Sequence, residues 1–289
     1  MTGAADHGAR RRGELLILAA AALFATGGAA LKSPPFSNWQ VAGVRAGIAA
    51  IAMAAMVPAA RRGWTGRTLL VGVPYAATLM LFAFSTRLTT AANAIFLQST
   101  APLWLLLLAP WLLRERIRRS DAVFMGVLAV GLVLLLVGAP PPAATAPNPV
   151  LGNVLGAASG LTWALAVSGL RWLAKDDTTG GAAAGATVAG NVIACLACLP
   201  FAWPLAAGTT EGWLVLVYLG VFQVALAYVC LTRGVRRVPA FEASLLLLLE
   251  PVLNPVWAWA VHGETPGPWA LAGGAVIVTA TAAYTLSKR

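Results

Sequence analysis

The stretch SLLLLLEPVLNPVWAWAV runs from Ser244 to Val261 and decides how the whole chain is read. It is almost wholly apolar, yet it carries the acid Glu250 and the prolines Pro251 and Pro255 in its middle. A plain membrane anchor has no need of an acid, and each proline removes a backbone N–H and displaces the carbonyl four residues earlier. In lipid such carbonyls must find partners within the protein. The stretch therefore predicts a membrane helix that faces a cavity or other helices.

The rest of the chain has the same character. Its 289 residues are 59% hydrophobic and only 10% charged, whereas soluble domains carry roughly 25% charged residues. Because the deficit extends over the whole length, we expect a polytopic membrane protein. The net charge is +10, but the sequence has no basic patch interleaved with aromatic residues, so we expect no nucleic-acid partner.

Ten apolar runs are long enough to cross a bilayer, which takes about 20 residues. They cover residues 14–31, 38–59, 68–87, 90–113, 121–138, 150–173, 183–203, 212–232, 239–262 and 267–286. With a cytoplasmic N-terminus, 17 of the 20 lysines and arginines fall on cytoplasmic segments, as the positive-inside rule requires. We therefore expect a multi-pass protein with both termini in the cytoplasm. The excess of Arg over Lys and the abundance of Ala and Gly suggest a GC-rich bacterial genome, so the expected location is a bacterial inner (plasma) membrane.

An internal repeat divides the chain. The segment NAIFLQSTAPLWLLLLAPWLLRERI aligns with EASLLLLLEPVLNPVWAWAVHGETP, which pairs Pro102 with Pro251 and Glu115 with Glu264 at one separation of 149 positions. Each half holds five spans, so the second half enters the membrane from the opposite side. Inverted repeats of this kind are characteristic of secondary transporters, which alternate access around a midplane site.

The fold class predicted from these patterns is an all-α membrane protein of ten transmembrane helices, arranged as two inverted five-helix repeats. The expected parts are a cytoplasmic tail (1–13), a first repeat (14–138), an external linker (139–149), a second repeat (150–286) and a cytoplasmic tail (287–289).

The paired elements APLWLLLLAPWLLRERI and EPVLNPVWAWAVHGETP resemble the EamA module of the drug/metabolite transporter superfamily, and Arg45 fits that pattern. The resemblance extends from about Gly13 to Leu286, and its diffuse motifs specify the superfamily better than the substrate. It implies a ten-helix basket around a central cavity. Among similar members it implies export of aromatic and other amino acids, or of cationic drugs such as methyl viologen. The chain departs from the pattern at His262 and Pro266, where the last loop is short and polar.

Two ionisable residues lie well inside the predicted spans. At 1.5 Å per residue, Glu250 lies roughly 16 Å along its helix and Arg45 roughly 9 Å deep. In one interpretation Arg45 binds a substrate carboxylate and Glu250 an ammonium group. In the other, both are structural and pair with each other or with freed backbone groups. Glu250 is also a candidate proton carrier, because a low dielectric disfavours the charged carboxylate.

Polar and aromatic residues at mid-span complete the candidate substrate site, although each could instead pack or face lipid. Phe24 and Trp163 occupy equivalent positions in the two repeats. The other expected site residues are Tyr75, Thr78, Phe82, Gln98, Thr100, Gln223, Tyr228, Ser244 and Asn254. Pro102, Pro251 and Pro255 are expected helix kinks. A cavity built from them is mostly apolar with sparse polar groups, which suits amphipathic solutes better than phosphates.

Cysteines and glycines receive structural interpretations. Cys195 and Cys198 lie in an apolar run without a second pair or a histidine nearby, so we interpret them as inert and expect no metal and no cofactor. Glycines spaced every four residues, such as Gly43 and Gly47 or the series from Gly152 to Gly160, predict close helix packing.

The inverted repeat predicts a secondary transporter that works by alternating access, and the resemblance implies that it exports amino acids and related small metabolites. The alternatives are an exporter of cationic drugs or other metabolites, a permease subunit of a pump, and a channel. No GxxxxGK[ST] phosphate loop is present, and every aspartate and histidine lies at or outside a span end, so we expect no enzyme. The expected partners are a small-molecule substrate and the lipid bilayer, and we expect a monomer.

Overall fold

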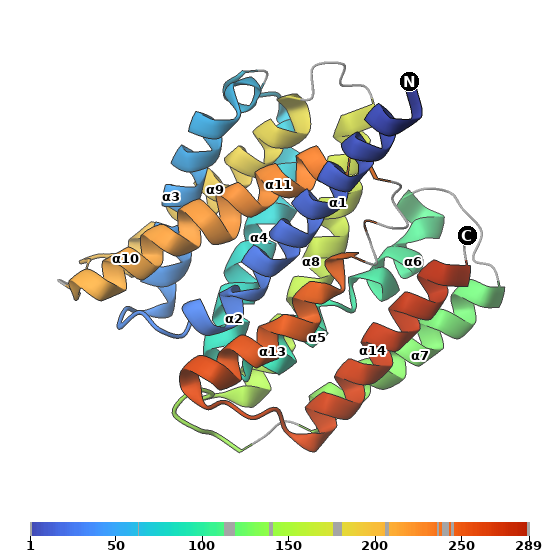
Figure 1. The fold of residues 1–289 in the computed structure, drawn as a ribbon. Coiled ribbons are helices and arrows are strands. Elements are labelled where there is room, and N and C mark those ends of the chain that lie inside the picture. Colours follow the sequence, from blue (N-terminus) through green and yellow to red (C-terminus); the bar gives the residue numbers. More distant parts are fainter. Residues whose placement is uncertain are drawn as a thin grey trace.

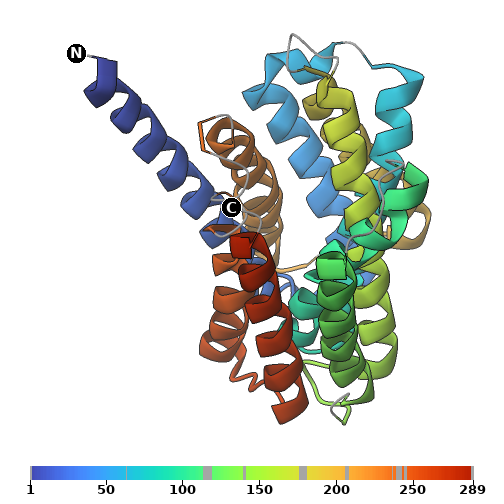
Figure 2. The ribbon, with the colours of Figure 1, turned by 90° about the vertical axis from the view of Figure 1, so that its right-hand side faces the viewer.

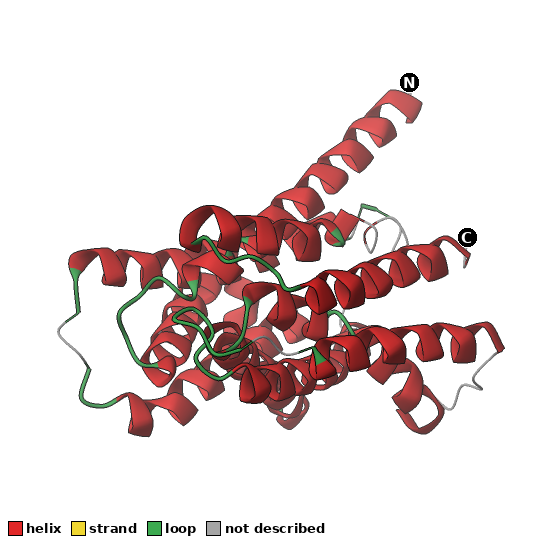
Figure 3. Ribbon diagram, turned by 90° about the horizontal axis from the view of Figure 1, so that it is seen from below, coloured by secondary structure: helices red, strands yellow, loops and turns green. Residues whose placement is uncertain are grey.

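The computed structural model is helical almost throughout (Figure 1), and the same character is evident when the molecule is seen from below (Figure 3). It describes residues 2–62, 64–112, 119–138, 141–175, 181–205, 208–235, 237–238, 243 and 246–287. The helices are α1 (Thr2–Ala25), α2 (Gly27–Ala30), α3 (Asn38–Met56), α4 (Gly66–Leu88), α5 (Ala91–Gln98), α6 (Ala101–Leu112), α7 (Arg119–Val137), α8 (Pro149–Lys175), α9 (Gly181–Ala202), α10 (Thr210–Tyr218), α11 (Ala227–Gly234), α13 (Leu249–His262) and α14 (Pro268–Ser287). A 3₁₀ turn, η1 (Pro58–Arg61), follows α3, and a π-helix, η2 (Leu219–Leu226), joins α10 to α11.

Nine helical segments among the described residues are long and apolar enough to cross a membrane. This finding confirms the predicted polytopic all-α fold. The tenth predicted span, 239–262, is represented by α13, while its residues 239–242, 244 and 245 lie outside the described part of the chain.

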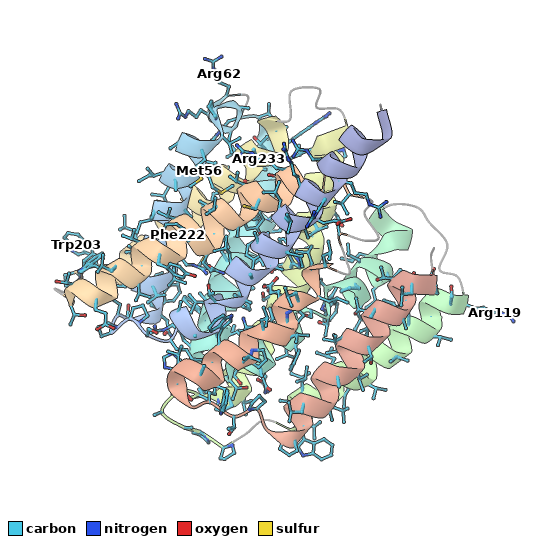
Figure 4. All side chains as sticks on the ribbon, in the orientation of Figure 1. Met56, Arg62, Arg119, Trp203, Phe222 and Arg233 are labelled. Atoms are coloured by element: carbon cyan, nitrogen blue, oxygen red, sulfur yellow. The ribbon has the colours of Figure 1, made fainter. Side chains whose placement is uncertain are left out.

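Both termini lie at the same end of the bundle (Figure 1), which an even number of crossings requires. Arg62, Arg119 and Arg233 lie toward that end, whereas Trp203 lies at the opposite end (Figure 4). These three arginines therefore lie toward the end of the bundle that carries the termini.

Helices from the two halves of the chain interleave. α4 packs against α8 and α9, α3 against α9, and α7 against α14, as the views at right angles show (Figure 2). Glycines permit this close approach. A Cβ added to Gly43 would lie 2.7 Å from Cβ of Cys198, and one added to Gly156 would lie 3.1 Å from Leu97. Cys198 is thus a small packing residue, and both it and Cys195 are free thiols.

Two membrane segments are interrupted at equivalent positions in the two halves. A turn at Ser99 and Thr100 separates α5 from α6, and a turn at Leu248 precedes α13. Ser99 stands 149 positions before Leu248, the same separation that aligns the repeats. Paired interruptions of this kind mark the substrate site in transporters with inverted repeats.

The prolines predicted as kinks lie beside these interruptions. Pro102 and Pro251 occupy the first turns of α6 and α13, where a proline has no intrahelical N–H bond to lose and its fixed φ suits a helix start. The chain is therefore broken next to them instead of being bent inside a continuous helix. Pro255 lies inside α13.

The first helix differs from the predicted span at both of its ends. α1 already begins at Thr2, and Arg10 and Glu14 pair at 3.3 Å on its exposed surface, four residues apart, a spacing that supports helices. α1 ends at Ala25, and the short helix α2 follows after Thr26. This early interruption brings Gly27 and Gly28 next to side chains of the second half.

Candidate substrate site

Four aromatic rings from four helices meet around Tyr228. The ring centroid of Tyr228 lies 5.2 Å from that of Phe24 on α1 and 5.4 Å from that of Tyr75 on α4, both in edge-on geometry. Trp163 on α8 lies 6.4 Å away. Tyr75 and Tyr228 are buried, while Phe24 and Trp163 are partly buried beside them. The structure thus brings together four of the five aromatic residues expected at mid-span, and the fifth, Phe82, lies elsewhere on α4.

Arg45 lies next to this aromatic cluster on α3, with 1% of its surface exposed. Its Nη2 donates to the carbonyl oxygen of Leu79 at 3.0 Å, and its Nη1 donates to Oε1 of Gln223 at 3.3 Å. Its Nε has no hydrogen-bond partner. A buried guanidinium normally satisfies its donors, so the open Nε–H is suited to an acceptor that arrives from outside the protein, such as a carboxylate.

Two more buried polar atoms near the aromatic cluster have no hydrogen bond of ordinary length. They are the hydroxyl of Tyr75 and Oδ1 of Asn191 on α9, and these two fully buried side chains lie close to each other. The amide nitrogen of Asn191 donates to the carbonyl of Thr187 at 2.9 Å, which leaves its oxygen free. More than about nine-tenths of buried polar groups in proteins have partners. A local group of unpaired ones therefore indicates that a ligand or water completes the network.

The π-helix η2 positions Gln223 at this point. π-helical turns are rare and occur frequently at functional sites. Gly27 lies directly against the Gln223 side chain, because a Cβ added to Gly27 would be 2.9 Å from Nε2. The lack of a side chain at Gly27 leaves the space in which Gln223 reaches Arg45.

Glu250 lies in the first turn of α13 and is partly exposed. It forms no hydrogen bond or ion pair with any residue that the structure describes, and it lies near enough to Tyr228 to interact electrostatically. The alternative in which Arg45 and Glu250 neutralise each other is not realised, since Arg45 uses an amide and a backbone carbonyl instead. An ionisable group at membrane depth without a partner is a functional hypothesis by default.

Asn254 lies one turn further along α13 and is fully buried, yet neither its Nδ2 nor its Oδ1 has a partner. Gly28 of α2 packs against it, and a Cβ at Gly28 would lie only 2.2 Å from Asn254 Oδ1. The interruption between α1 and α2 thus lies between Gln223 on one side and Asn254 on the other. Any larger residue at Gly28 would displace Asn254.

Two other predicted site residues are engaged with α8. The hydroxyl of Thr78 donates to the carbonyl of Pro74 at 2.8 Å and lies 3.0 Å from the hydroxyl of Thr162. The amide of Gln98 donates to Ser159 at 2.8 Å. These bonds hold first-half helices against α8, so the two side chains already have partners within the protein.

The remaining predicted residues contribute in other ways. Thr100 donates to the carbonyl of Leu97 at 2.6 Å and closes the turn between α5 and α6. Phe82 is buried in the larger apolar cluster with Phe96, apart from the cluster around Tyr228. Ser244 lies outside the residues that the structure describes.

A separate groove of about 260 Å³ lies between α2, α10 and α13. Its walls are apolar and include Ala29, Val215 and Trp257. At its edge the hydroxyl of Tyr218 donates to Thr26 Oγ1 at 2.9 Å. None of the predicted site residues lines this groove.

Sequence reasoning missed two features. Asn191 is an amide in the middle of an apolar helix, and that contrast was the available signal. Lys32 and Glu264 form a buried ion pair at 2.6 Å, whereas the repeat had singled out Glu264 only as the counterpart of Glu115. Within the described residues, no group of three His, Cys, Asp or Glu side chains could hold a metal ion.

Interrupted helices that meet around a polar, aromatic centre, in a chain of two repeated halves, define the architecture of a membrane transporter. The chain matches the model of the EamA-like transporter family twice, over residues 11–137 and 150–286. It belongs to that family, and it is a multi-pass membrane transporter of the drug/metabolite transporter superfamily.

One solved structure, described as the crystal structure of a protein, covers 96% of this chain and 98% of its own with a TM-score of 0.64 and 21% sequence identity. This similarity shows a shared fold. No curated protein matches the chain.

Proposed function

We propose that the protein exports amino acids, aromatic or neutral, and related small metabolites across a bacterial inner membrane. The observation that supports this proposal most directly is the group of unpaired polar atoms on Arg45, Tyr75 and Asn191 next to four aromatic rings and an unpaired Glu250. An amino acid carries a carboxylate, an ammonium group and a side chain, and each has a counterpart here.

In this proposal the substrate carboxylate binds to Arg45 Nε and the Tyr75 hydroxyl, both of which lack a hydrogen bond of ordinary length within the protein. The ammonium group binds to Glu250, whose carboxylate has no partner among the described residues. The rings of Phe24, Trp163 and Tyr228 contact the substrate side chain, because aromatic faces and edges favour apolar and aromatic groups.

Alternating access follows from the interruptions in α5–α6 and before α13. Short helices joined by turns can change their relative angle without breaking a continuous hydrogen-bond ladder, and both turns lie at equivalent positions around the centre. Both termini face the cytoplasm in this proposal, in keeping with Arg62, Arg119 and Arg233 at their end of the bundle (Figure 4).

The test is counterflow in proteoliposomes loaded with aromatic, neutral, basic or acidic amino acids. We expect saturable exchange of aromatic or neutral amino acids and loss of exchange in Arg45→Gln and in Glu250→Gln. Absence of exchange for every amino acid, with folded protein in the vesicles, would reject the proposed substrate class. Non-saturating flux would instead indicate a channel.

Export of organic cations is the second candidate. Glu250, which has no partner among the described residues and lies near Tyr228, favours it specifically. A quaternary or aromatic cation is attracted both by a carboxylate and by ring faces. The two candidates differ in their need for Arg45, because a cation has no carboxylate. If methyl viologen is transported, Arg45→Gln should leave its transport intact or increase it, whereas Glu250→Gln should abolish it.

A further inference from the structure

A second polar centre lies at the end of the bundle opposite the termini. Lys32, just after α2, has all three ammonium donors satisfied. Its Nζ donates to the carbonyl of Thr89 at 2.8 Å, to the carbonyl of Thr145 at 2.5 Å and to Oε2 of Glu264 at 2.6 Å. Each of these three partners comes from a different connection in the chain.

The second oxygen of Glu264 is also occupied. Its Oε1 accepts the backbone N–H of Ala91, the first residue of α5. A carboxylate in that position also interacts favourably with the helix dipole. The side chains of Lys32 and Glu264 are 4% and 5% exposed, so water has little access to the pair.

The pair joins parts of the molecule that carry the site. Lys32 follows α2, which packs on Asn254, while Glu264 lies near the start of the connection that follows α13, the helix that carries Glu250. Thr89 and Ala91 lie at the junction of α4 and α5, in the first half of the chain. Contacts to this one pair therefore hold α2, α4, α5 and α13 together at one end (Figure 1).

Arg87 on α4 holds the loop that carries Lys32 in place. It donates to the carbonyls of Leu31 at 2.8 Å and Phe36 at 2.7 Å, and to Oδ1 of Asn38 at 2.6 Å. These bonds fasten the loop that carries Lys32 to α4. The bond from Lys32 to Glu264 is the link from this loop to the second half.

We propose that the Lys32–Glu264 pair is the gate that closes this end of the transporter and separates when the site opens toward this side. α13 contains 14 residues and is therefore about 21 Å long at 1.5 Å per residue. It connects Glu250 in its first turn to Glu264, which lies just beyond its last turn. A tilt of α13 at the substrate site must move Glu264 relative to Ala91 and Lys32.

The pair can open readily because burial is unfavourable for its two charges. Burial lowers the pKa of Lys32 below its ordinary value, since the cost of desolvation exceeds the attraction of Glu264, and the nearby charge of Arg87 lowers it further. Separation of the pair returns both charges to water and recovers that cost. A buried ion pair of this kind can therefore close this end of the transporter reversibly.

Opening of this gate does not depend on which substrate the transporter carries. Ala258 provides a position to test it. Ala258 is 1% exposed and lies one turn beyond Asn254 on α13, between the site and the gate. In a protein with Cys195, Cys198 and Cys230 replaced by alanine, the variant Ala258→Cys reports access of water from this end.

The measurement is the rate at which a membrane-impermeant maleimide labels Ala258→Cys in vesicles. We expect slow labelling with the gate intact and labelling faster by about tenfold or more after Glu264→Gln, because a buried pair that loses one partner is strongly destabilised. The matched control is Glu211→Gln, which replaces an exposed acid in the first turn of α10 and should leave the rate unchanged. Equal rates with and without the Glu264 carboxylate would overturn the gate.

Locking the pair provides an independent test if the substitution weakens folding. In Lys32→Cys with Glu264→Cys, a short bis-thiosulfonate crosslinker should stop counterflow, and reduction should restore it. Each single cysteine variant treated with the same reagent should keep its transport. Transport that continues in the fully crosslinked protein would show that transport does not require these two positions to separate, and it would overturn the proposal. If instead no amino acid is exchanged but labelling still responds to Glu264→Gln, the proposed substrate class fails while the gate remains.

Discussion

The polar centre around Arg45 and the polar centre around Lys32 are opposites in one respect. Lys32 has three acceptors for its three donors, and Glu264 has a donor at each oxygen. The Nε–H of Arg45 has no acceptor, and the Tyr75 hydroxyl has no hydrogen bond of ordinary length. Both centres are buried, so the difference lies in how completely the protein fills the hydrogen-bonding capacity of each.

The difference separates a site that holds the protein together from a site that waits for a ligand. A buried polar group without a partner destabilises the structure by about 1–3 kcal/mol, and such groups persist where binding later satisfies them. A complete network, by contrast, leaves nothing for a substrate to bind. Each of the following substitutions acts on one side of this contrast.

The largest effect is expected at Arg45. Arg45→Gln removes the charge and the open N–H, and hydrogen bonds to charged groups contribute about 1.5–3 kcal/mol. Transport of an amino acid should therefore fall by about 10- to 100-fold, measured as kcat/KM in proteoliposomes. The thermal unfolding midpoint should change little, because an unsatisfied buried charge is removed together with its desolvation cost. Unchanged transport would show that Arg45 is structural.

The next effect concerns stability at Lys32. Lys32→Met leaves Glu264 without its cation, and we expect a loss of about 1–3 kcal/mol in the free energy of unfolding, below the 3–5 kcal/mol of a fully trapped pair because the gate can open to water. Thermal unfolding in lipid nanodiscs measures it. The control is Arg10→Ala, which removes a pair on the exposed surface of α1 and should cost no more than about 1 kcal/mol. Equal effects of the two substitutions would contradict the contrast between them.

Trp163 sharpens the aromatic part of the site. Trp163→Ala should raise KM for aromatic amino acids about three- to tenfold, the range that an aromatic contact contributes beyond its area. Trp163→Phe keeps a ring 6.4 Å or somewhat further from Tyr228 and should retain most of the affinity. If KM were unchanged in Trp163→Ala, the substrate would bind elsewhere, and the groove at Trp257 would then be the next position to test.

The smallest effect is expected for the cysteines. Cys195 is a free, partly buried thiol beside Gly47, 3.0 Å from a Cβ added there. Cys195→Ala should change the unfolding free energy by less than about 1 kcal/mol and leave transport intact, since small packing residues tolerate such changes. A large loss of transport would give this thiol a role that its surroundings do not suggest.

Several parts of this site could be predicted from the chain alone. Phe24 and Trp163 were found through the repeat, and Arg45 and Glu250 through their charge at membrane depth. The sequence predicted a kink at Pro102 but not the break at Ser99–Thr100. A proline predicts a missing hydrogen bond, but it does not decide whether the helix bends or ends. Asn191 could not be singled out, since a lone amide gains meaning only from its neighbours on other helices.

The sequence by itself determined that the chain crosses a membrane many times in two repeated halves. Hydrophobic length and the distribution of arginines are one-dimensional properties, and the bilayer responds to them segment by segment. The tertiary structure decided which polar groups are paired. Lys32 and Glu264 are 232 positions apart and meet at 2.6 Å, whereas Arg45 binds Gln223 and Leu79 and does not pair with Glu250. Helix packing sets these distances, and a partner is gained or lost within about 1 Å.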